Sequence, residues 1–374
     1  CYHCAMSFWH TLPQPIVGLA PMDGVTDTAF RYIMAQHGKP DVQYTEFVSV
    51  DEISRGTASV WRQLRFHELE RPILAQIYGT DPTKFYQAAH IVCTLGFDGV
   101  DINMGCPAKN VSARGCGAAL ITTPHLAQEI IRAVQAGVRD WSSGHTLTHI
   151  GLSHRVVEQV QQLATAQPSH QKKLQQSIPV SVKTRIGYDT VVIEDWVSTL
   201  LDTQPEVITL HGRTLAQLYR GQADWDAIRR GVNLARETST LLLGNGDIHS
   251  MGEVAERTQA TRAHGVLIGR GALGNPWVFR EKGHLRQPET MPSSPASSGA
   301  VPVHERLRVA LEHAHYFASL QDDCPFVAMR KHLGWYCRGF PGAAEVRAAM
   351  FKTTTVEDVA QIFESLESMQ AVAG

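Results

Sequence analysis

Short apolar runs alternate with segments of helical periodicity along most of this chain. Each run is rich in β-branched residues and is bounded by turn residues. Nearly continuous apolarity is typical of parallel strands that are buried on both faces. The pattern predicts eight strands, at residues 16–22, 42–48, 72–79, 99–106, 179–187, 207–213, 241–248 and 265–272.

Helical segments separate these strands, and two of them begin at a proline, a residue favoured at the first helical position. Alternation of strand and helix over residues 16–280 predicts an α/β fold of the (β/α)8 TIM-barrel type. A doubly wound open sheet is the alternative, and it is disfavoured because no G-x-G-x-x-G follows the first strand. The helices are expected at 26–37, 82–95, 124–137, 193–203, 224–236 and 250–263.

The remaining segments divide the chain into further regions. Residues 1–15 are predicted to be an N-terminal tail, and the barrel is expected over 16–287. An insertion at 139–178 is interpreted as a helical excursion with a mobile, polar end. The Pro/Ser-rich stretch 288–302 is typical of a linker, and residues 303–374 have the pattern of a small helical domain.

Composition excludes several classes of protein. The 374 residues are 43% hydrophobic and 19% charged, so the chain is not a disordered one. A net charge of −2 excludes a strongly basic nucleic-acid binder but leaves room for a local basic patch. Without a visible secretory signal or an apolar run of about 18 residues, we expect a cytoplasmic protein that does not enter membranes. Seven scattered cysteines indicate reduced thiols, and we expect a monomer with no metal site.

Polar residues and glycines follow the predicted strands at the end where barrels carry their functional groups. The glycines after strands seven and eight predict a phosphate site, to which Arg270 would add charge-assisted hydrogen bonds. The strand-end residues are Pro21, Met22, Asp23, Gln76, Asn103, Cys106, Lys183, Arg185, His211, Asn245, Gly246, Asp247, Gly269 and Arg270.

Eight motifs carry a resemblance to a known family. In chain order they are APMDGVTDTAFR (20–31), INMGCPAKNV (102–111), GCGAALI (115–121), VKTRIGYD (182–189), HGRTLAQLYRGQADWDAI (211–228), NGDI (245–248), GRGALGNPWVF (269–279) and RKHLGWY (330–336). With these motifs the chain resembles the tRNA-dihydrouridine synthases, flavoproteins that reduce uridine in RNA, and most of all their bacterial B-type branch. The resemblance covers most of residues 16–360 but excludes 139–178.

The resemblance implies FMN across the mouth of the barrel and NADPH as reductant. Pro21, Met22 and Asp23 would line the flavin ring, and Gln76 would bind a ring edge. Lys183 would lie near flavin N1, where a cation stabilises the anionic reduced ring; an interior ion pair with a barrel carboxylate is the alternative. His211 would contact the flavin or its ribityl chain. The ribityl phosphate region would be held by Asn245, Gly246, Asp247, Gly269 and Arg270.

The resemblance also assigns the substrate chemistry. Hydride would reach uracil C6 from the reduced flavin, and the thiol of Cys106 would give the proton to C5. A thiol near its ordinary pKa of about 8.5 is mostly protonated at neutral pH and can donate. A small buried hydrophobic residue is the alternative, and it suits Cys93, Cys324 and Cys337. Asn103 and Arg185 are expected to contact the substrate.

The helical domain offers interleaved basic and aromatic residues, as a surface for RNA requires. Arg330, Lys331 and Arg338 are expected to bind the RNA, whose target base must leave its stack. An ordinary amphipathic helix, with Trp335 and Tyr336 in the core, is the alternative.

The predicted function is an FMN- and NADPH-dependent reductase that converts uridine in tRNA to 5,6-dihydrouridine. Another FMN-dependent barrel reductase, acting on a free pyrimidine or other small unsaturated carbonyl compound, is the first alternative. A non-catalytic RNA-binding protein is the second.

Overall fold

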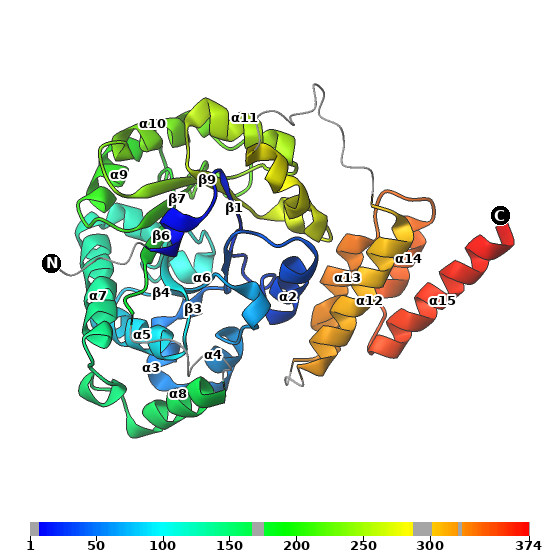
Figure 1. The fold of residues 1–374 in the computed structure, drawn as a ribbon, viewed down its shortest axis with the longest axis horizontal. Helices are drawn as coiled ribbons and strands as arrows, with labels where there is room; N and C mark the ends of the chain where they lie inside the picture. The colour runs from blue at the N-terminus through cyan, green and yellow to red at the C-terminus, as the bar shows by residue number, and fades with distance from the viewer. Residues whose placement is uncertain (1–6, 167–175, 287–300, 321–323, 374) are drawn as a thin grey trace.

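A computed structural model describes residues 7–166, 176–286, 301–320 and 324–373 of the 374-residue chain. Its larger part is a barrel of parallel strands surrounded by helices, and its smaller part is a group of helices at one side (Figure 1). The strands are β1 (Ile16–Leu19), β2 (Gln43–Tyr44), β3 (Val48–Ser49), β4 (Ile73–Tyr78), β5 (Gly99–Met104), β6 (Val180–Arg185), β7 (Val207–His211), β8 (Leu241–Asn245) and β9 (Gly265–Ile268).

The strands pair in the order β1-β9-β8-β7-β6-β5-β4-β2, and every pair is parallel. The barrel closes through the segment before β2, where the Asp41 N–H donates to the Val17 carbonyl and the Leu19 N–H donates to the Val42 carbonyl, both over 2.9 Å. The predicted (β/α)8 TIM barrel is therefore confirmed.

The strand predicted at 42–48 is interrupted and forms β2 and β3 in place of one continuous strand. Side-chain chemistry explains the interruption. The Gln76 N–H of β4 donates over 3.0 Å to the hydroxyl oxygen of Thr45, where a continuous ladder would offer a backbone carbonyl. The backbone therefore leaves the ladder at Thr45 and returns to β4 at Val48.

The predicted barrel helices form with small shifts at their ends. Asp27 begins α2 by accepting from the Phe30 N–H over 2.8 Å, and α5 starts at a proline after the capping residue Asp81. The helices are α2 (Thr28–His37), α5 (Pro82–Thr94), α7 (Pro124–Ser142), α9 (Ile193–Leu201), α10 (Trp225–Ala235) and α11 (Met251–Thr261). Shorter helices are α3 (Val50–Arg55), α4 (Ala58–Gln63), α6 (Lys109–Ser112) and the 3-10 segments η1 (Glu68–Glu70), η2 (Gly117–Thr122), η5 (Arg270–Ala272) and η6 (Pro276–Arg286).

The predicted insertion begins inside α7, which continues to Ser142, and then forms η3 (Leu147–His149) and α8 (His154–Ala166). Helix α8 lies against α5 at the outside of the barrel. The polar end predicted to be mobile falls largely in 167–175, and most of the predicted linker falls in 287–300, both outside the described residues.

Residues 7–15, predicted as part of a tail, instead close the amino-terminal end of the barrel. The short helix α1 (Phe8–Thr11) places the indole of Trp9 in the core with no exposed surface. Trp9 packs there with the first residues of several strands, among them Ile16, Val207 and Leu241. Burial of so large an apolar side chain orders the segment, which has no periodic pattern that the sequence could reveal.

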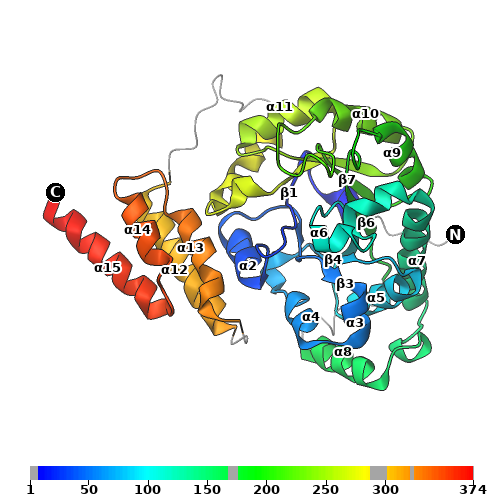
Figure 2. The same ribbon diagram turned by 180° about the vertical axis from the view of Figure 1, so that it is seen from behind.

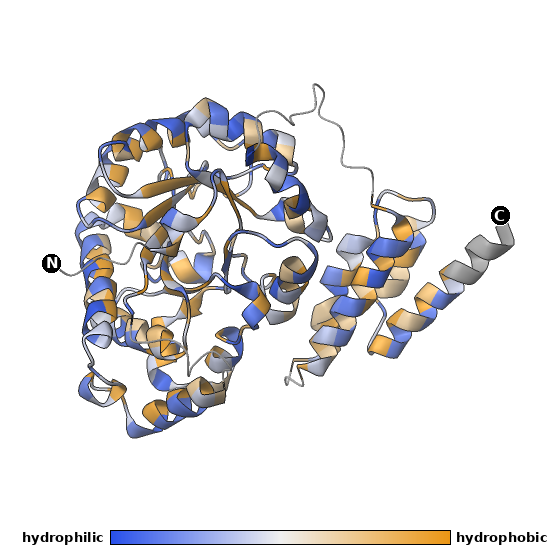
Figure 3. Ribbon diagram, viewed as in Figure 1, coloured by the Kyte–Doolittle hydropathy of each residue, from blue (hydrophilic) through white to orange (hydrophobic). Residues whose placement is uncertain are grey.

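Hydropathy follows this arrangement. Figure 3 shows the strands in the apolar colour and the surrounding helices with mixed faces, as expected when apolar stripes cover a buried sheet. No helix in the described part of the chain has the length and apolarity needed to cross a membrane.

The smaller part consists of α12 (Val303–Ser319), η8 (Phe326–Met329), α13 (Arg330–Tyr336), α14 (Ala343–Met350) and α15 (Val356–Ala373). It lies beside α2 of the barrel, as both views show (Figures 1 and 2). Tyr32 of α2 stacks on Tyr316 of α12 with 3.8 Å between the ring centroids. Aromatic contacts therefore join this helical domain to the barrel.

Candidate active site

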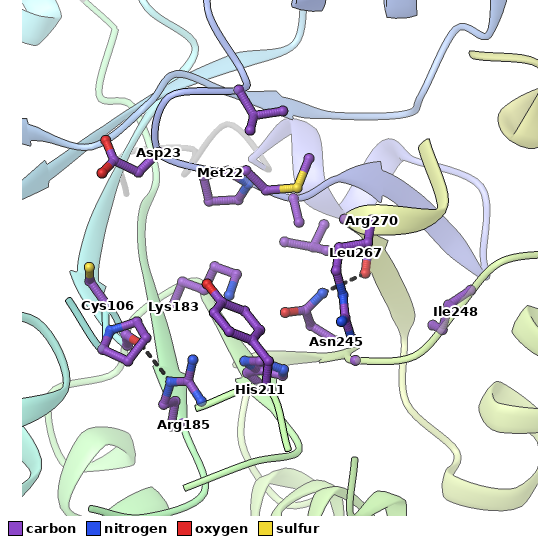
Figure 4. Close-up of a pocket in the computed structure, with 18 of the residues that line it drawn as sticks. Met22, Asp23, Cys106, Lys183, Arg185, His211, Asn245, Ile248, Leu267 and Arg270 are labelled. Atoms are coloured by element: carbon purple, nitrogen blue, oxygen red, sulfur yellow. Dashed lines mark hydrogen bonds between the residues drawn. The ribbon is translucent and has the colours of Figure 1, made fainter. Parts of the chain in front are cut away.

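A cavity of about 300 Å³ opens at the carboxyl ends of the barrel strands (Figure 4). Every barrel residue predicted from the sequence as a site residue lines it. They are Pro21, Met22, Asp23, Gln76, Asn103, Cys106, Lys183, Arg185, His211, Asn245, Gly246, Asp247, Gly269 and Arg270. Sequence reasoning missed Phe47, Tyr219 and His249, which also line the cavity.

A chain of hydrogen bonds fixes the amides on the floor of the cavity. The side-chain amide of Gln76 donates through Nε2 to the Asp101 carboxylate over 2.6 Å. The side-chain amide of Asn103 donates through Nδ2 to Oε1 of Gln76 over 2.9 Å. The Ser181 hydroxyl holds the other Asp101 oxygen at 2.5 Å. These bonds fix which way the side-chain amides of Gln76 and Asn103 point their N–H₂ and oxygen ends. Asp101 was not predicted as a site residue, although a carboxylate within an apolar strand was a signal for it.

The turn that carries Cys106 is held from two sides. Oδ1 of the Asn103 side chain accepts from the backbone N–H groups of Gly105 and Cys106, over 3.0 and 2.9 Å. Arg185 donates to the Gly105 carbonyl over 2.7 Å. These contacts fix the backbone from which the Cys106 side chain projects toward the cavity (Figure 4).

The Cys106 thiol is protonated at neutral pH. Its residue is 8% exposed, and burial raises its pKa above the ordinary value, as does the nearby charge of Asp23. Arg185 and Lys183 oppose this shift but do not overcome it. The arrangement can therefore present a proton donor to a group in the cavity.

Positive charge concentrates beside Cys106, at Lys183 and Arg185 (Figure 4). Burial and the charge of Arg185 lower the pKa of Lys183 to about 8, against the attraction of Asp101. Among the residues that the structure describes, none forms a direct ion pair or hydrogen bond with Lys183, although the charge of Asp101 attracts it. Its contact with a flavin stays a prediction. Burial, with Lys183 and three arginines nearby, keeps the pKa of His211 well below its ordinary value. His211 is therefore neutral beside several cations.

The predicted phosphate region contains two arginines that share one carboxylate. Arg213 and Arg270 donate to the two oxygens of Asp247, over 2.7 and 2.9 Å. Gly246 has a φ of +128°, and a Cβ there would lie 2.7 Å from Ala223 and 3.2 Å from the His211 ring. Only glycine fits this position without a shift of its neighbours. Arg213 belongs to the HGRTL motif but was not predicted as a site residue.

Arg185 is held by backbone carbonyls through Nε and Nη1. Besides the Gly105 carbonyl, it donates to the carbonyls of Thr214 and Leu218, over 3.0 and 3.2 Å. Burial lowers its pKa to about 10, so it remains charged at neutral pH. It ties the Cys106 turn to the loop after β7, and its predicted contact with substrate stays a prediction.

The three cations predicted in the helical domain do not line the cavity. Arg330 donates to the Thr353 carbonyl over 2.7 Å, and Arg338 donates to the Leu273 carbonyl. Lys331 instead points toward the loop after β1, near Gly24. Lys331 and Arg338 thus approach the rim of the site, since Leu273 lines the cavity, whereas no contact of Arg330 reaches it.

Comparison with known proteins identifies the family. The model of the family described as "Dihydrouridine synthase (Dus)" matches residues 18–167 and 158–372. The chain belongs to this family. A dihydrouridine synthase relative in Bacillus subtilis (strain 168), named "Probable tRNA-dihydrouridine synthase 2", is 31% identical over 96% of this chain and 97% of its own length. A Staphylococcus aureus (strain COL) relative, "Probable tRNA-dihydrouridine synthase", is 30% identical over 97% of this chain and 96% of its own length. This chain thus resembles bacterial dihydrouridine synthases over nearly its full length.

In the part of the chain that the structure describes, no cluster of three or more His, Cys, Asp or Glu side chains could hold a metal ion. Among the described residues, Cys106, Cys116, Cys324 and Cys337 form no disulfide.

Proposed function

We propose that this enzyme reduces the 5,6-double bond of uridine in tRNA, with NADPH as the electron source, FMN as the cofactor and Cys106 as the proton donor. The observation that carries the proposal is the pairing, in one cavity of a dihydrouridine synthase, of a protonated buried thiol with a cation-rich wall. Reduction of a carbon–carbon double bond needs one hydride and one proton. The thiol would give the proton, and the cations would bind the anionic cofactor that gives the hydride.

The residues present fit FMN. Arg270 is half-exposed and keeps donors free beyond its contact with Asp247, so it can bind a phosphate. The missing side chains of Gly246 and Gly269 let the backbone approach such a group. Pro21, Met22 and Gln76 would face the ring, and Lys183 would lie near its N1 edge. Bound FMN would supply hydride to uracil C6 from its N5 atom.

Cys106 would protonate C5 from the other side of the substrate. Its thiol holds the proton at neutral pH, because burial disfavours the thiolate. Asn103 keeps the turn in place through two backbone N–H groups and retains one amide hydrogen that can meet the uracil. Asn103 would therefore orient both the Cys106 thiol, which gives the proton, and the uracil, which receives it.

Recognition of tRNA would rest on cations around the rim. Guanidinium groups carry several N–H donors, so Arg330 and Arg338 can bind phosphates while they hold backbone carbonyls. Arg185, Lys331 and these two residues would together lead a flipped uridine toward Cys106.

The test compares substrates in one assay. The purified protein should bind FMN, show its visible absorption bands, and oxidise NADPH faster with dihydrouridine-free tRNA than with free uridine. Faster turnover of free uridine or another small unsaturated carbonyl compound would contradict the tRNA assignment. Failure to bind FMN with retained RNA binding would instead indicate a non-catalytic RNA-binding protein.

A further inference from the structure

The loop between β1 and α2, residues 20–27, has one end in the cavity and the other at the helical domain. Met22 and Asp23 line the cavity, and Asp27 caps α2. Thr26, which has no exposed surface, closes the loop into a tight turn. Its hydroxyl accepts from the Met22 N–H over 3.1 Å, and its N–H donates to the Met22 carbonyl over 3.0 Å. A displacement of Asp27 would therefore be passed to Met22.

Asp27 faces a buried histidine of the helical domain. Nε2 of His332 lies 3.4 Å from Oδ2 of Asp27, and His332 is 1% exposed. Burial alone would raise the pKa of Asp27, but His332, His313 and the Phe30 N–H together hold it well below the ordinary range. Asp27 is therefore a charged, partly exposed group at the contact between the two domains, with its side chain 30% exposed.

Aromatic rings hold His332 in that position. Its ring lies 4.9 Å from Trp335, 5.0 Å from His313 and 5.6 Å from Phe30 of α2, measured between centroids. In the described part of the chain, neither ring nitrogen has a hydrogen-bond partner within bonding geometry, so Nε2 meets Asp27 as an ion-pair contact only. Among the described residues, Asp27 is thus the one acidic residue with which a His332 ring nitrogen forms an ion-pair contact.

Lys331 reaches the same loop from the neighbouring position. A Cβ placed on Gly24 would lie 3.6 Å from the Lys331 Nζ, so the ammonium lies against the loop backbone. Burial raises the pKa of Asp23, and the charge of Lys331 opposes that rise. On the other side, the carboxyl of Glu46 meets the backbone N–H of Gly24. The loop is therefore held between Glu46 of the barrel and the Lys331–His332 pair.

We propose that His332 and Lys331 are positioning residues for the reduction: they hold the loop 22–27 so that Met22 and Asp23 face the cavity in the reactive arrangement. The helical domain then sets the rate of the chemical step in addition to the affinity for RNA. The inference rests on the proposed function, since it assigns residues to that reaction.

The test uses FMN-loaded full-length protein with His332→Leu, which removes the polar contact, and His332→Gln, which restores a donor. We expect His332→Leu to lower the single-turnover rate of dihydrouridine formation at saturating tRNA about tenfold, because misplaced reacting groups lose rate. We also expect a shifted flavin absorption spectrum and an unchanged Kd for tRNA. His332→Gln should restore most of the rate. His315→Leu, at an exposed position on α12, is the matched control and should behave as wild type.

An effect confined to the Kd for tRNA, or an unchanged rate and spectrum, would overturn the inference. If His332→Leu does not fold, Lys331→Met replaces it, at a partly exposed position. Lys331→Met should lower the rate at saturating tRNA and Lys331→Arg should restore it; an effect on Kd alone would again overturn the inference. Wild-type protein that forms no dihydrouridine would refute the proposed function instead, and the flavin spectrum of His332→Leu would then decide the inference by itself.

Discussion

Functional residues were predicted both at the barrel mouth and in the segment 330–338 of the helical domain. The structure brings the first set together around one cavity but does not bring the second set to one surface. At the mouth, every predicted side chain lines one cavity. In the segment, His332 and Tyr336 are buried, while the guanidinium groups of Arg330 and Arg338 hold backbone carbonyls. Parallel strands bring their ends together by topology, whereas successive residues of a helix point in directions about 100° apart and do not share one face. Adjacency in sequence is therefore weaker evidence for a shared surface than position at strand ends.

The two regions also differ in how their charges are satisfied. Lys183 at the mouth has no partner among the described residues, and burial lowers its pKa to about 8. Arg330 of the segment instead closes the end of α14 by donating to the Thr353 carbonyl. Unpaired buried charge destabilises a fold and is typical of functional sites, whereas paired charge is structural. The comparison predicts large effects on chemistry at the mouth and small effects in the segment.

The largest effect is expected from Cys106→Ala. Loss of a general acid should lower the single-turnover rate of dihydrouridine formation about 10²- to 10⁴-fold, with flavin reduction by NADPH unchanged. Cys116→Ala is the matched control, because Cys116 is buried in the same apolar cluster. An equal loss of rate in the two variants would show that packing, and not proton donation, causes the effect. The large effect on chemistry that distinguishes the mouth from the segment would then be unsupported.

A smaller effect is expected in the binding of FMN to the apoprotein. Lys183 is protonated below a pKa of about 8 and loses its charge as the pH rises through that value. The affinity for FMN should therefore fall between pH 7 and 9, by about tenfold or about 1.4 kcal/mol. Flavin fluorescence measures it. Lys183→Met should bind more weakly at pH 7 and lose this dependence; a dependence that persisted would assign it to another group.

Arg338→Ala should have a modest effect on tRNA binding. The side chain is exposed, and removal of one phosphate contact should weaken binding a few-fold at low salt. The slope of log K against log salt should fall by about one. Titrations at several salt concentrations measure both. An unchanged slope would make the cations of this segment purely structural and sharpen the contrast with the mouth.

The smallest effect is expected from Tyr336→Phe. The Tyr336 hydroxyl lies 3.3 Å from Nδ1 of His313, and loss of this buried hydrogen bond should lower the free energy of unfolding by about 1 kcal/mol. Denaturant unfolding measures the change. The Kd for tRNA should stay the same, since Tyr336 belongs to the core. Weaker tRNA binding without loss of stability would place this aromatic ring on the RNA surface after all.

The sequence was sufficient to predict many of the residues that lie at the mouth of the barrel. The positions of Cys106 and Lys183 at the mouth follow from the strand ends, because every parallel strand ends at the same rim, whereas their roles rest on the family resemblance. Asp101 escaped because its role depends on a cross-strand contact with Gln76. Trp9 and the Asp27–His332 contact escaped for a similar reason, since each joins segments far apart in the chain. Periodicity describes local structure and carries no information about such pairs.

The central claim is that the cavity at the barrel mouth reduces uridine within tRNA. The most direct test incubates the FMN-loaded protein with NADPH and dihydrouridine-free tRNA, followed by nuclease digestion and mass spectrometry. We predict that a uridine-containing fragment gains the mass of two hydrogen atoms. NADPH oxidation by the flavin-loaded protein without any gain of mass in the tRNA would contradict the claim.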